Sequence, residues 1–445
     1  MRTPKHPIRL LTLTLSAVLL LSVTGCKTQS VDIREKTAKV SETTSAVSES
    51  TVSSQPESSV WTPTSSSEPV SSQSVSEVPV SSTVSAESSS ESMFFSVPAE
   101  FEDGGIFSAY YEDAYRYMTQ MTLEEKIGQM LFSSLPYEEP LETAATYHLG
   151  GYILFGNDFV GQTKESVKDM LNTLSIAQKV PLAFAVDEEG GTVTRISAKK
   201  SLSDHEFQSP RTLYKNGGLA YIQSDADEKA SLLKELGLDI NFAPVCDIAT
   251  NKKDFMYDRS LGQDAKTTAE FVRIVTEMSQ LRGVSVTLKH FPGYGQNVDT
   301  HTGIAVDKRE LKEFQEKDFL PFQSGIQAGA HLVMVSHNIV ECMDKDVPAS
   351  LSPAVHKILR EQLGFTGLII TDDLSMGAIT AYTGQNTPAV AAVLAGNDVL
   401  IITSGMIESA CNSIKEAVSN GTITENQIDH AVLRILAWKY AKGIM

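Results

Sequence analysis

The sequence predicts an α/β protein whose folded part is a single (β/α)8 barrel of the TIM type, preceded by a signal peptide and a disordered serine-rich linker. Two observations predict the barrel. From Met118 onward, short apolar runs alternate with longer amphipathic stretches, which is the rhythm of βα units. Polar residues repeatedly follow the apolar runs, at the strand ends where such barrels gather their chemistry. About 330 residues suffice for one barrel and leave no room for a sizeable second domain.

Residues 1–25 have the pattern of a secretory signal peptide. Lys5 and Arg9 precede an apolar run from Leu10 to Leu21, which is too short for a comfortable transmembrane span. The following Val23-Thr24-Gly25-Cys26 resembles the box of bacterial lipoproteins. The resemblance implies cleavage before Cys26 and a lipid on this cysteine, so we expect an extracytoplasmic protein anchored to the cell membrane. An ordinary signal peptide with an incidental cysteine is the alternative.

Residues 26–95 are expected to form a solvated tether. Ser, Thr, Val, Glu and Pro dominate this stretch, and no Lys or Arg occurs between Lys39 and Arg116. A segment of low hydrophobicity whose charges are mainly negative cannot form a hydrophobic core. A tether of this length reaches roughly 45 Å. It would hold the catalytic domain, residues 96–445, off the membrane surface, and such a stalk suits a Gram-positive cell wall.

The barrel requires eight strands alternating with helices, and eight apolar runs can be named. The expected strands are Gln129 to Phe132, Tyr152 to Phe155, Leu182 to Val186, Ile240 to Val245, Ser285 to His290, Leu332 to Val335, Leu368 to Thr371, and Val399 to Ile402. The helices expected between them include Thr163 to Gln178, Thr267 to Leu281, Arg309 to Ala328, Ala354 to Leu363 and Thr387 to Leu394. A doubly wound sheet would place its site at one switch point and not around a ring.

Composition excludes several classes of function. The formal net charge of -18 argues against nucleic acid and against electrostatic adhesion to anionic lipid. The cysteines Cys246, Cys342 and Cys411 are an odd, widely spaced set, which is no disulfide framework. We expect Cys246 to be a small buried packing residue. No zinc-type spacing and no phosphate-binding glycine loop occurs, so we expect neither a metal nor an organic cofactor. We also expect the chain to act as a monomer.

The segment from Lys289 to His301 is the most informative stretch of the chain. Lys289-His290 ends an expected strand, Pro292-Gly293-Tyr294-Gly295 forces a tight loop, and Asp299-Thr300-His301 follows. Asp299 and His301 are two positions apart, so their side chains can meet on one side of an extended stretch. A histidine oriented by a carboxylate is suited to general acid/base catalysis near neutral pH. An isolated Asp-x-His would fit a solvated loop equally well, but the preceding string favours catalysis.

This string resembles the signature of family 3 glycoside hydrolases of the β-N-acetylhexosaminidase type, the NagZ-like enzymes. The resemblance extends over nearly everything from Met118 to the C-terminus. It includes Ala185-Val186-Asp187-Glu188-Glu189-Gly190-Gly191, Asn241-Phe242-Ala243-Pro244-Val245 and Ile370-Thr371-Asp372-Asp373-Leu374-Ser375-Met376. The loop departs from the family pattern at Tyr294, where a histidine is expected, at Thr300, where serine is more usual, and at Gln296-Asn297-Val298.

The resemblance implies the role of each site residue. Glycoside hydrolysis with retention needs a carboxylate on one side of the anomeric carbon and a proton donor on the other. Asp372 matches the nucleophile, with Asp373 as the fallback, and His301 with Asp299 matches the acid/base pair. The positions that match sugar-binding residues are Asp187, Arg195, Arg259, Lys289 and His290. Arg195 could instead simply pair with Asp187, Arg259 could be a surface charge, and the role of His337 stays open.

The expected function is a retaining exo-β-N-acetylglucosaminidase that releases terminal β-linked N-acetylglucosamine from peptidoglycan-derived or related glycans. Two alternatives keep the fold and the site. One is a phosphorolytic enzyme in which phosphate replaces water, and the other is a β-glucosidase. A third is a non-catalytic sugar-binding lipoprotein, which would have no need for the complete set of Asp372, Asp299 and His301.

Overall fold

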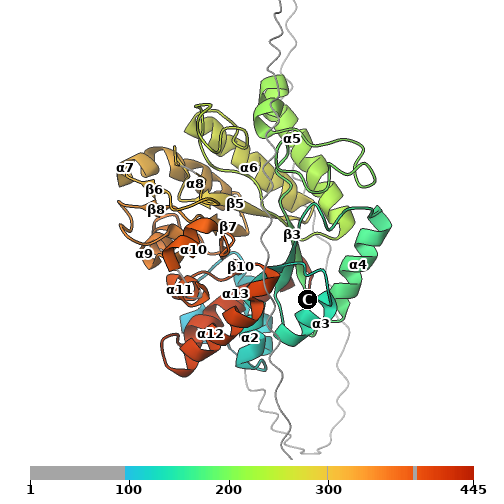
Figure 1. Cartoon of the computed structure of the whole chain (residues 1–445), viewed down its shortest axis with the longest axis vertical. Coiled ribbons are helices and arrows are strands. Elements are labelled where there is room, and N and C mark those ends of the chain that lie inside the picture. The colour runs from blue at the N-terminus through green and yellow to red at the C-terminus, as the bar shows by residue number, and fades with distance from the viewer. Residues whose placement is uncertain (1–95, 298, 384–387) are drawn as a thin grey trace, which may run out of the picture. The chain divides into compact units, whose positions relative to one another are not determined.

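Eight parallel strands form a barrel at the centre of the computed structural model, which describes residues 96–445 except 298 and 384–387 (Figure 1). The expected signal peptide, Cys26 and linker lie outside the described residues. The strands are β1 (Leu131–Ser134), β2 (Gly151–Leu154), β3 (Ala183–Val186), β4 (Ile240–Asn241), β5 (Ser285–Phe291), β7 (Leu332–Val335), β9 (Leu368–Thr371) and β10 (Leu400–Ile402). Their order is β10-β1-β2-β3-β4-β5-β7-β9, and a parallel bridge between Ile370 and Val399 closes the ring.

The predicted barrel is therefore confirmed, and each expected strand is present. All residues of β7 and β9 are buried, because one face of each strand fills the barrel and the other packs under helices. One strand differs from the expectation: β4 pairs only over Ile240–Asn241. Beyond it the segment from Phe242 to Val245 continues along β5, with a bridge from Val245 to Lys289. The carbonyls of Ala243 and Pro244 accept N–H groups of β5, but Pro244 has no N–H of its own to donate.

Helices surround the strands. They are α1 (Tyr111–Met118), α2 (Leu123–Gln129), α3 (Pro140–Tyr147), α4 (Lys164–Ile176), α5 (Pro210–Leu236), α6 (Ala265–Leu281), α7 (Leu311–Glu313), α8 (Phe319–Gln327), α9 (Pro353–Lys357), α10 (Gly377–Thr383), α11 (Ala389–Ala395), α12 (Ile407–Ser419) and α13 (Glu425–Lys442). Side chains fix where several begin. Thr163 caps α4 in a capping box with Ser166, and Asp264 caps α6 by accepting the N–H of Thr267.

Two expected helices are interrupted by π-helical turns. The stretch from Arg309 to Ala328 consists of α7, a π turn at Phe314–Asp318, and α8. The widened turn allows Phe314, Asp318 and Phe319 all to be buried, which a regular helix would not place on one face. The stretch from Ala354 to Leu363 is likewise α9 followed by a π turn at Ile358–Gln362.

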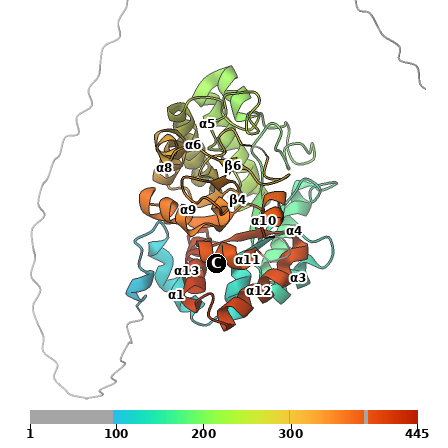
Figure 2. The same cartoon turned by 60° about the vertical axis from the view of Figure 1, so that its left-hand side comes forward.

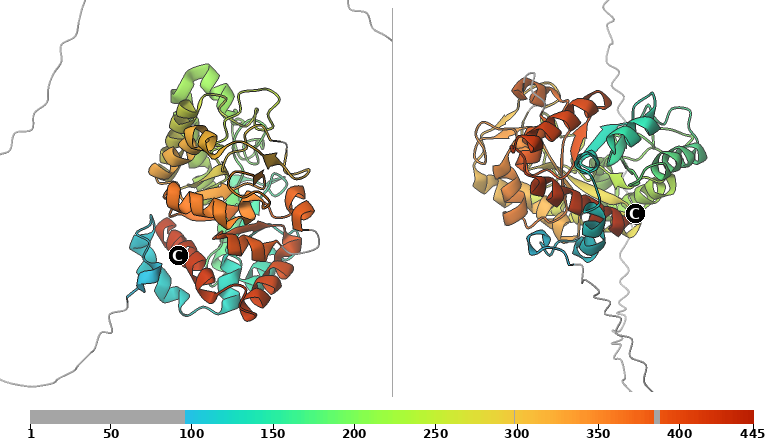
Figure 3. Two further views of the ribbon diagram at one scale, coloured as in Figure 1. Left: turned by 90° about the vertical axis from the view of Figure 1, so that its left-hand side faces the viewer. Right: turned by 90° about the horizontal axis from the view of Figure 1, so that it is seen from below.

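The last helix covers the amino ends of the barrel strands. In α13, Trp438 is fully buried and its Nε1 donates to Ser285 Oγ at the start of β5. The neighbouring Lys439 Nζ donates to Gln129 Oε1 and to the carbonyl of Pro181. Helices α1 and α2 pack against α13, so both ends of the described chain lie together (Figures 2 and 3). The opposite, carboxyl end of the barrel is left for the site.

A second, two-stranded sheet lies beyond the barrel strands. Strand β6 (Val306–Asp307) pairs in parallel with β8 (Ile339–Val340). The first follows the loop that leaves β5, and the second follows β7, so this small sheet ties two loops at the carboxyl end of the barrel together. No helix in the described part of the chain is both long and apolar enough to cross a membrane.

Candidate active site

The carboxyl ends of the barrel strands enclose a pocket of about 190 Å³. Its polar lining consists of predicted site residues: Asp187, Arg195, Arg259, Lys289, His290, His301 and Asp372. Its apolar lining comes from other strand ends: Ile153, Phe155, Val193, Phe242, Met334 and Ile401. The remaining predicted residue, Asp299, lies behind His301. The structure thus brings together residues that are up to 185 positions apart, from Asp187 to Asp372, because the barrel gathers its strand ends in one ring.

Lys289 is the centre of a buried cluster of charges. Its Nζ lies 2.7 Å from Asp187 Oδ1 and 2.7 Å from Glu189 Oε1. Glu189 in turn accepts two hydrogen bonds from Arg259, one from Nη2 at 2.6 Å and one from Nε at 3.0 Å. This two-pronged geometry fixes the guanidinium plane. Arg259 is therefore held inside the site, and the alternative interpretation as a surface charge is wrong.

The cluster holds its members ionised. Burial raises the pKa of Glu189, but Lys289 and Arg259 outweigh burial and lower that pKa well below its usual range. Burial likewise lowers the pKa of Lys289, and Asp187 and Glu189 more than reverse this, so its pKa is raised. Of the two carboxylates, only Asp187 lines the pocket, where its side chain is 19% exposed. Asp187 is thus the carboxylate of the cluster that faces the pocket.

Sequence reasoning missed Glu189 as a site residue and quoted it only as part of a motif. Two signals could have found it. Glu189 is the third of three consecutive acids after an apolar strand, and the predicted cations Lys289 and Arg259 require more negative charge than Asp187 alone supplies once they are buried.

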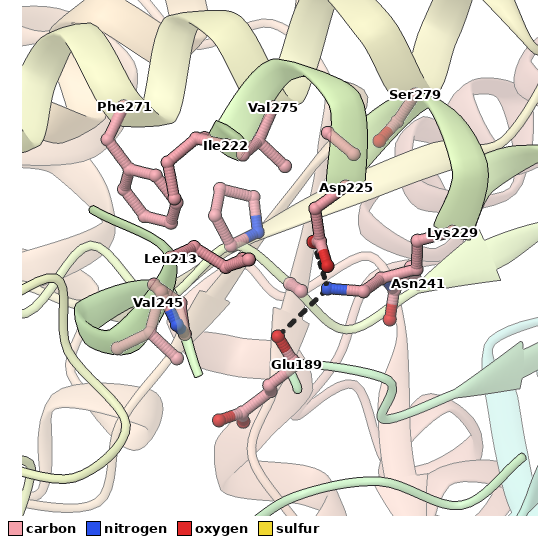
Figure 4. A pocket seen from close by; sticks show the side chains of 14 residues that line it. Glu189, Leu213, Ile222, Asp225, Lys229, Asn241, Val245, Phe271, Val275 and Ser279 are labelled. Atoms are coloured by element: carbon pink, nitrogen blue, oxygen red, sulfur yellow. Dashed lines mark hydrogen bonds and ion pairs between the residues drawn. The ribbon is translucent and has the colours of Figure 1, made fainter. Parts of the chain in front are cut away.

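A cavity behind Glu189 shows how its main chain is held (Figure 4). The cavity is lined mostly by apolar side chains of α5 and α6 and encloses only about 30 Å³, room for a water molecule or two and not for a sugar. Lys229 of α5 reaches into it, and its Nζ donates to the carbonyl of Glu189 at 3.0 Å and to Asp225 Oδ2 at 2.9 Å. Lys229 thus anchors the main chain of Glu189, while Lys289 and Arg259 hold its carboxylate.

The loop that carries Arg195 is organised by a second acid that sequence reasoning missed. The Glu188 carboxylate accepts the N–H groups of Arg195 and Ile196, both at 2.8 Å. The Arg195 Nη2 lies 3.8 Å from Asp187 Oδ2, a loose pair, because Asp187 is already bonded to Lys289. Arg195 therefore lies at the pocket in a loose ion pair with Asp187, and its contact with a ligand stays a prediction.

His290 is fixed by Asp247, which follows β4. The His290 Nδ1 lies 2.7 Å from Asp247 Oδ2, and the same carboxylate accepts the N–H of His290 and that of Tyr294. With Nδ1 engaged, the Nε2 atom points toward the pocket and lies 3.3 Å from Arg259 Nη2. His290 is hence both buried and turned to the site, not a histidine that only fills the core.

Asp372 leaves the end of β9 and enters the pocket. Its N–H donates to the carbonyl of Val335, and its Oδ1 accepts the N–H of Asp373 at 2.9 Å. Burial raises the pKa of Asp372, but His337, His290 and Lys289, together with the Asp373 N–H, outweigh burial and lower it. The carboxylate makes no ion pair with any described residue. Asp372 therefore presents an ionised carboxylate to the pocket, and no described cation is paired with it.

His337 supports the turn behind Asp372. Burial lowers the pKa of His337, and the nearby Asp372 and the Asp373 carbonyl oppose this effect. Its Nε2 donates to the carbonyl of Asp373 at 2.9 Å, and its Nδ1 lies 2.7 Å from Ser350 Oγ. The Asp373 carboxylate faces the chain and accepts the N–H of Ser375, as expected for the fallback residue. His337 thus positions the backbone of the turn and does not line the pocket.

Asp299 and His301 form the pair that their spacing predicts. The His301 Nδ1 lies 2.6 Å from Asp299 Oδ1, and the same oxygen accepts the His301 N–H at 2.9 Å. His301 is on the edge of the pocket with 60% of its side chain exposed. Because Asp299 engages Nδ1, the Nε2 atom is the one free to meet a ligand.

The glycines of this loop are required by the ion pair beneath it. Gly293 and Gly295 have φ values of 121° and 57°. A Cβ at Gly293 would collide with the carboxylate of Asp318, and one at Gly295 with the guanidinium of Arg309. Arg309 and Asp318 lie 2.8 Å apart and form the base of the loop.

Taken as chemistry, the pocket offers an unpaired carboxylate, a histidine held by a carboxylate, and a buried set of fixed charges. These groups are suited to nucleophilic attack and proton transfer at one atom of a bound ligand. In the described part of the chain, no group of three or more His, Cys, Asp or Glu side chains is placed to hold a metal ion.

The family described as "Glycosyl hydrolase family 3 N terminal domain" matches residues 122–438. The β-hexosaminidase of Xanthomonas campestris pv. campestris (strain B100) is 33% identical over 258 residues, which cover 57% of this chain and 77% of that protein. These matches span most of the barrel.

Solved structures agree with the sequence matches. A family 3 β-N-acetylglucosaminidase from a Paenibacillus species superimposes with a TM-score of 0.68 at 29% identity, covering 73% of this chain and 63% of that one. The β-glucoside phosphorylase BglX has a TM-score of 0.66 at 22% identity, covering 75% of this chain and 60% of that one, and at this identity it shares the fold alone.

Proposed function

The chain belongs to glycoside hydrolase family 3 and is a glycoside hydrolase of the β-N-acetylhexosaminidase type, and from this premise we propose that it is a retaining exo-β-N-acetylglucosaminidase. One observation carries the proposal. Asp372, which no described cation pairs with, shares a pocket with a histidine whose Nδ1 is held by Asp299. Most retaining glycosidases use two carboxyl groups, so here His301 takes the place of the second.

In the first step, a carboxylate oxygen of Asp372 attacks the anomeric carbon of the bound sugar. The bond from that carbon to the glycosidic oxygen breaks, and protonated His301 gives its Nε2 proton to the departing oxygen. The product is a glycosyl ester on Asp372 and a neutral imidazole. In the second step His301 takes a proton from water, the water oxygen bonds to the anomeric carbon, and the ester bond breaks to restore Asp372.

The charged cluster is proposed to bind the sugar. Asp187 can accept two hydroxyl groups, while Arg195, Arg259 and Lys289 can donate to hydroxyl or acetyl oxygens. The volume of about 190 Å³ is below the roughly 300–1,000 Å³ of pockets for drug-sized ligands, which favours one terminal sugar over an internal stretch of glycan. The apolar lining offers contact to the ring and the acetyl methyl.

Two enzymatic alternatives are tested together with the main proposal. The purified protein is incubated with an aryl β-N-acetylglucosaminide and the matching β-glucoside, each with and without phosphate. Free N-acetylglucosamine in both buffers supports hydrolysis. N-acetylglucosamine 1-phosphate would mean phosphorolysis, preference for the glucoside would mean a β-glucosidase, and inertness of the folded protein would leave the sugar-binding lipoprotein.

Replacing His301 by alanine is expected to reduce kcat/KM by about 10²–10⁴-fold for a substrate with a poor leaving group, the range that general acid/base catalysis contributes. A dinitrophenyl leaving group departs without a proton, so kcat/KM for that substrate should change little. An equal loss on both substrates would contradict the acid role. Gln263→Ala, a polar change outside the pocket, serves as the control.

We propose that the natural substrates are wall-derived glycans met at the outer face of the membrane. This rests on residues 1–95, where the signal pattern, Cys26 and the serine-rich tether lie in succession. Cys26→Ala is expected to move the protein from the membrane fraction to the soluble extracytoplasmic fraction, because the lipid is its only predicted anchor. Unchanged membrane recovery would refute the lipid anchor but not the enzymatic proposal.

A further inference from the structure

We propose that Tyr294 is a positioning residue for catalysis: its hydroxyl clasps Thr300 and so fixes where His301 meets the substrate. The inference rests on the acid/base role proposed for His301. Tyr294 and Thr300 both lie in the loop that leads from β5 to His301.

The clasp is a pair of hydrogen bonds inside the loop. The Tyr294 hydroxyl is bonded to Thr300 Oγ1 and also accepts the Thr300 N–H at 3.2 Å. Both residues are buried, Tyr294 with 2% and Thr300 with 0% of their surfaces exposed. His301, the next residue, is exposed, and of side chains it is bonded only to Asp299, two residues before it, among the described contacts. The backbone position of His301 is thus fixed by the contacts of Thr300, the residue before it.

The same segment is clamped from the other side by the helix that follows the nucleophile. The carbonyl of Thr300 accepts the N–H of Ala378 at 3.0 Å, at the start of α10. A Cβ at Gly377 would lie 2.6 Å from the carbonyl oxygen of His301, so only glycine allows this approach. Because α10 begins shortly after Asp372, the acid/base loop and the nucleophile are docked on each other through Thr300.

Tyr294 also reaches the sugar-binding cluster. Its N–H donates to Asp247 Oδ1 at 2.7 Å, and Asp247 holds His290 through the other carboxylate oxygen. The rings of Tyr294 and His290 are packed edge to face with centroids 5.5 Å apart. One buried side chain therefore connects the residues proposed to hold the sugar with the residue proposed to protonate the leaving oxygen.

The size of the effect follows from the contact. Burial raises the pKa of Tyr294 to about 12, so the phenol stays protonated at working pH and the clasp is a neutral hydrogen bond. A buried neutral hydrogen bond contributes about 1 kcal/mol, or about fivefold. Misplacing a catalytic group by 1 Å can cost about 10²-fold. We expect the loss of kcat/KM in Tyr294→Phe to lie between these two limits, near tenfold.

The test compares two β-N-acetylglucosaminides, one with a dinitrophenyl and one with a methoxyphenyl leaving group. For Tyr294→Phe and Thr300→Val, kcat/KM on the methoxyphenyl substrate should fall about tenfold, and on the dinitrophenyl substrate less than about twofold. The double variant should be no worse than Tyr294→Phe alone, because Tyr294→Phe already removes both bonds of the clasp, whereas Thr300→Val removes only the bond to Oγ1. Thr300→Ser keeps the hydroxyl and should retain wild-type values.

A matched control removes a buried tyrosine hydroxyl elsewhere. Tyr152 is fully buried on β2, and its hydroxyl donates to the carbonyl of Pro140 at 2.6 Å. Tyr152→Phe should leave the ratio of the two substrates unchanged, whatever it does to thermal stability. If Tyr294→Phe lowers kcat/KM equally on both substrates, or on neither, the inference is overturned.

The His301→Ala variant separates the two proposals. If it loses activity selectively on the methoxyphenyl substrate and Tyr294→Phe does not, only the clasp is refuted. If His301→Ala itself shows no selectivity for the leaving group, the acid/base role fails and the clasp fails with it.

Discussion

Replacing Asp372 by alanine is expected to lower kcat/KM on an aryl β-N-acetylglucosaminide by roughly 10⁴-fold or more, which corresponds to about 5.5 kcal/mol of transition-state stabilisation. The variant has no oxygen to form the glycosyl ester, and the next carboxylate in the chain, that of Asp373, is turned away to the N–H of Ser375. Thermal unfolding should show that the variant is folded. Steady-state kinetics on purified protein measure the loss.

Covalent labelling identifies the nucleophile directly. A fluorinated N-acetylglucosaminyl inhibitor with a good leaving group slows the second step more than the first, so the ester on Asp372 should accumulate in wild-type protein. Mass spectrometry of the digest should find the sugar on the peptide that contains Asp372. Asp373→Asn is the matched control, and it should still be labelled. A label on Asp373, or on Asp187, would contradict the assignment.

The pH dependence of labelling adds a second check. The pKa of Asp372 is lowered in the folded protein, so its carboxylate is ionised from neutral pH down to below the ordinary aspartate value of about 3.9. The labelling rate should therefore not fall through protonation of Asp372 as the pH is lowered from 7 to 5. The inhibitor should carry a dinitrophenyl group, because that leaving group needs no acid. If labelling by this inhibitor is lost between pH 7 and pH 5, the nucleophile is not Asp372.

The barrel could be predicted because its strands carry their own signal. Runs such as Leu332 to Val335 and Leu368 to Thr371 are apolar throughout, and the predicted and observed bounds coincide since both faces of each strand are buried. The π turn at Phe314–Asp318 could not be predicted in the same way. It depends on which side chains are buried by tertiary contacts, such as that of Asp318 with Arg309, and not on the local apolar period.

The site divides in a similar manner. Strand ends and the Asp-x-His spacing placed Lys289, His290 and the Asp299–His301 pair, because neighbours in sequence are also neighbours in space. The partners of these residues come from other strands. Glu189 meets Arg259 across 70 positions and Asp247 meets His290 across 43, and nothing in either local segment indicates the other. Such pairs require the register of the barrel.

Removing Glu189 should be the most destabilising single change in the site. Glu189→Ala deletes the common partner of Lys289 and Arg259, which leaves Arg259 without an ion-pair partner among the described residues. Breaking a buried ion pair from one side costs about 3–5 kcal/mol. Chemical denaturation at pH 7 should show this loss. Glu270→Ala is the matched control, because Glu270 grips Arg273 with the same two-pronged geometry on the exposed face of α6 and its removal should cost at most about 1 kcal/mol.

The acid dependence of that loss distinguishes the ion cluster from simple packing. The pKa of Glu189 is lowered in the folded protein, while in the unfolded chain it is near the ordinary glutamate value of about 4.3. The unfolded state therefore binds the proton first as the pH falls, so the stability that the ionised carboxylate contributes is complete above about pH 5 and declines progressively as the pH falls below about 4 toward the lowered pKa of the folded state. The gap between wild type and Glu189→Ala should accordingly be widest at neutral pH and narrow in acid. A gap that stays constant from pH 7 to pH 3 would mean that Glu189 stabilises the barrel by filling space, and that Lys289 and Arg259 do not depend on its charge.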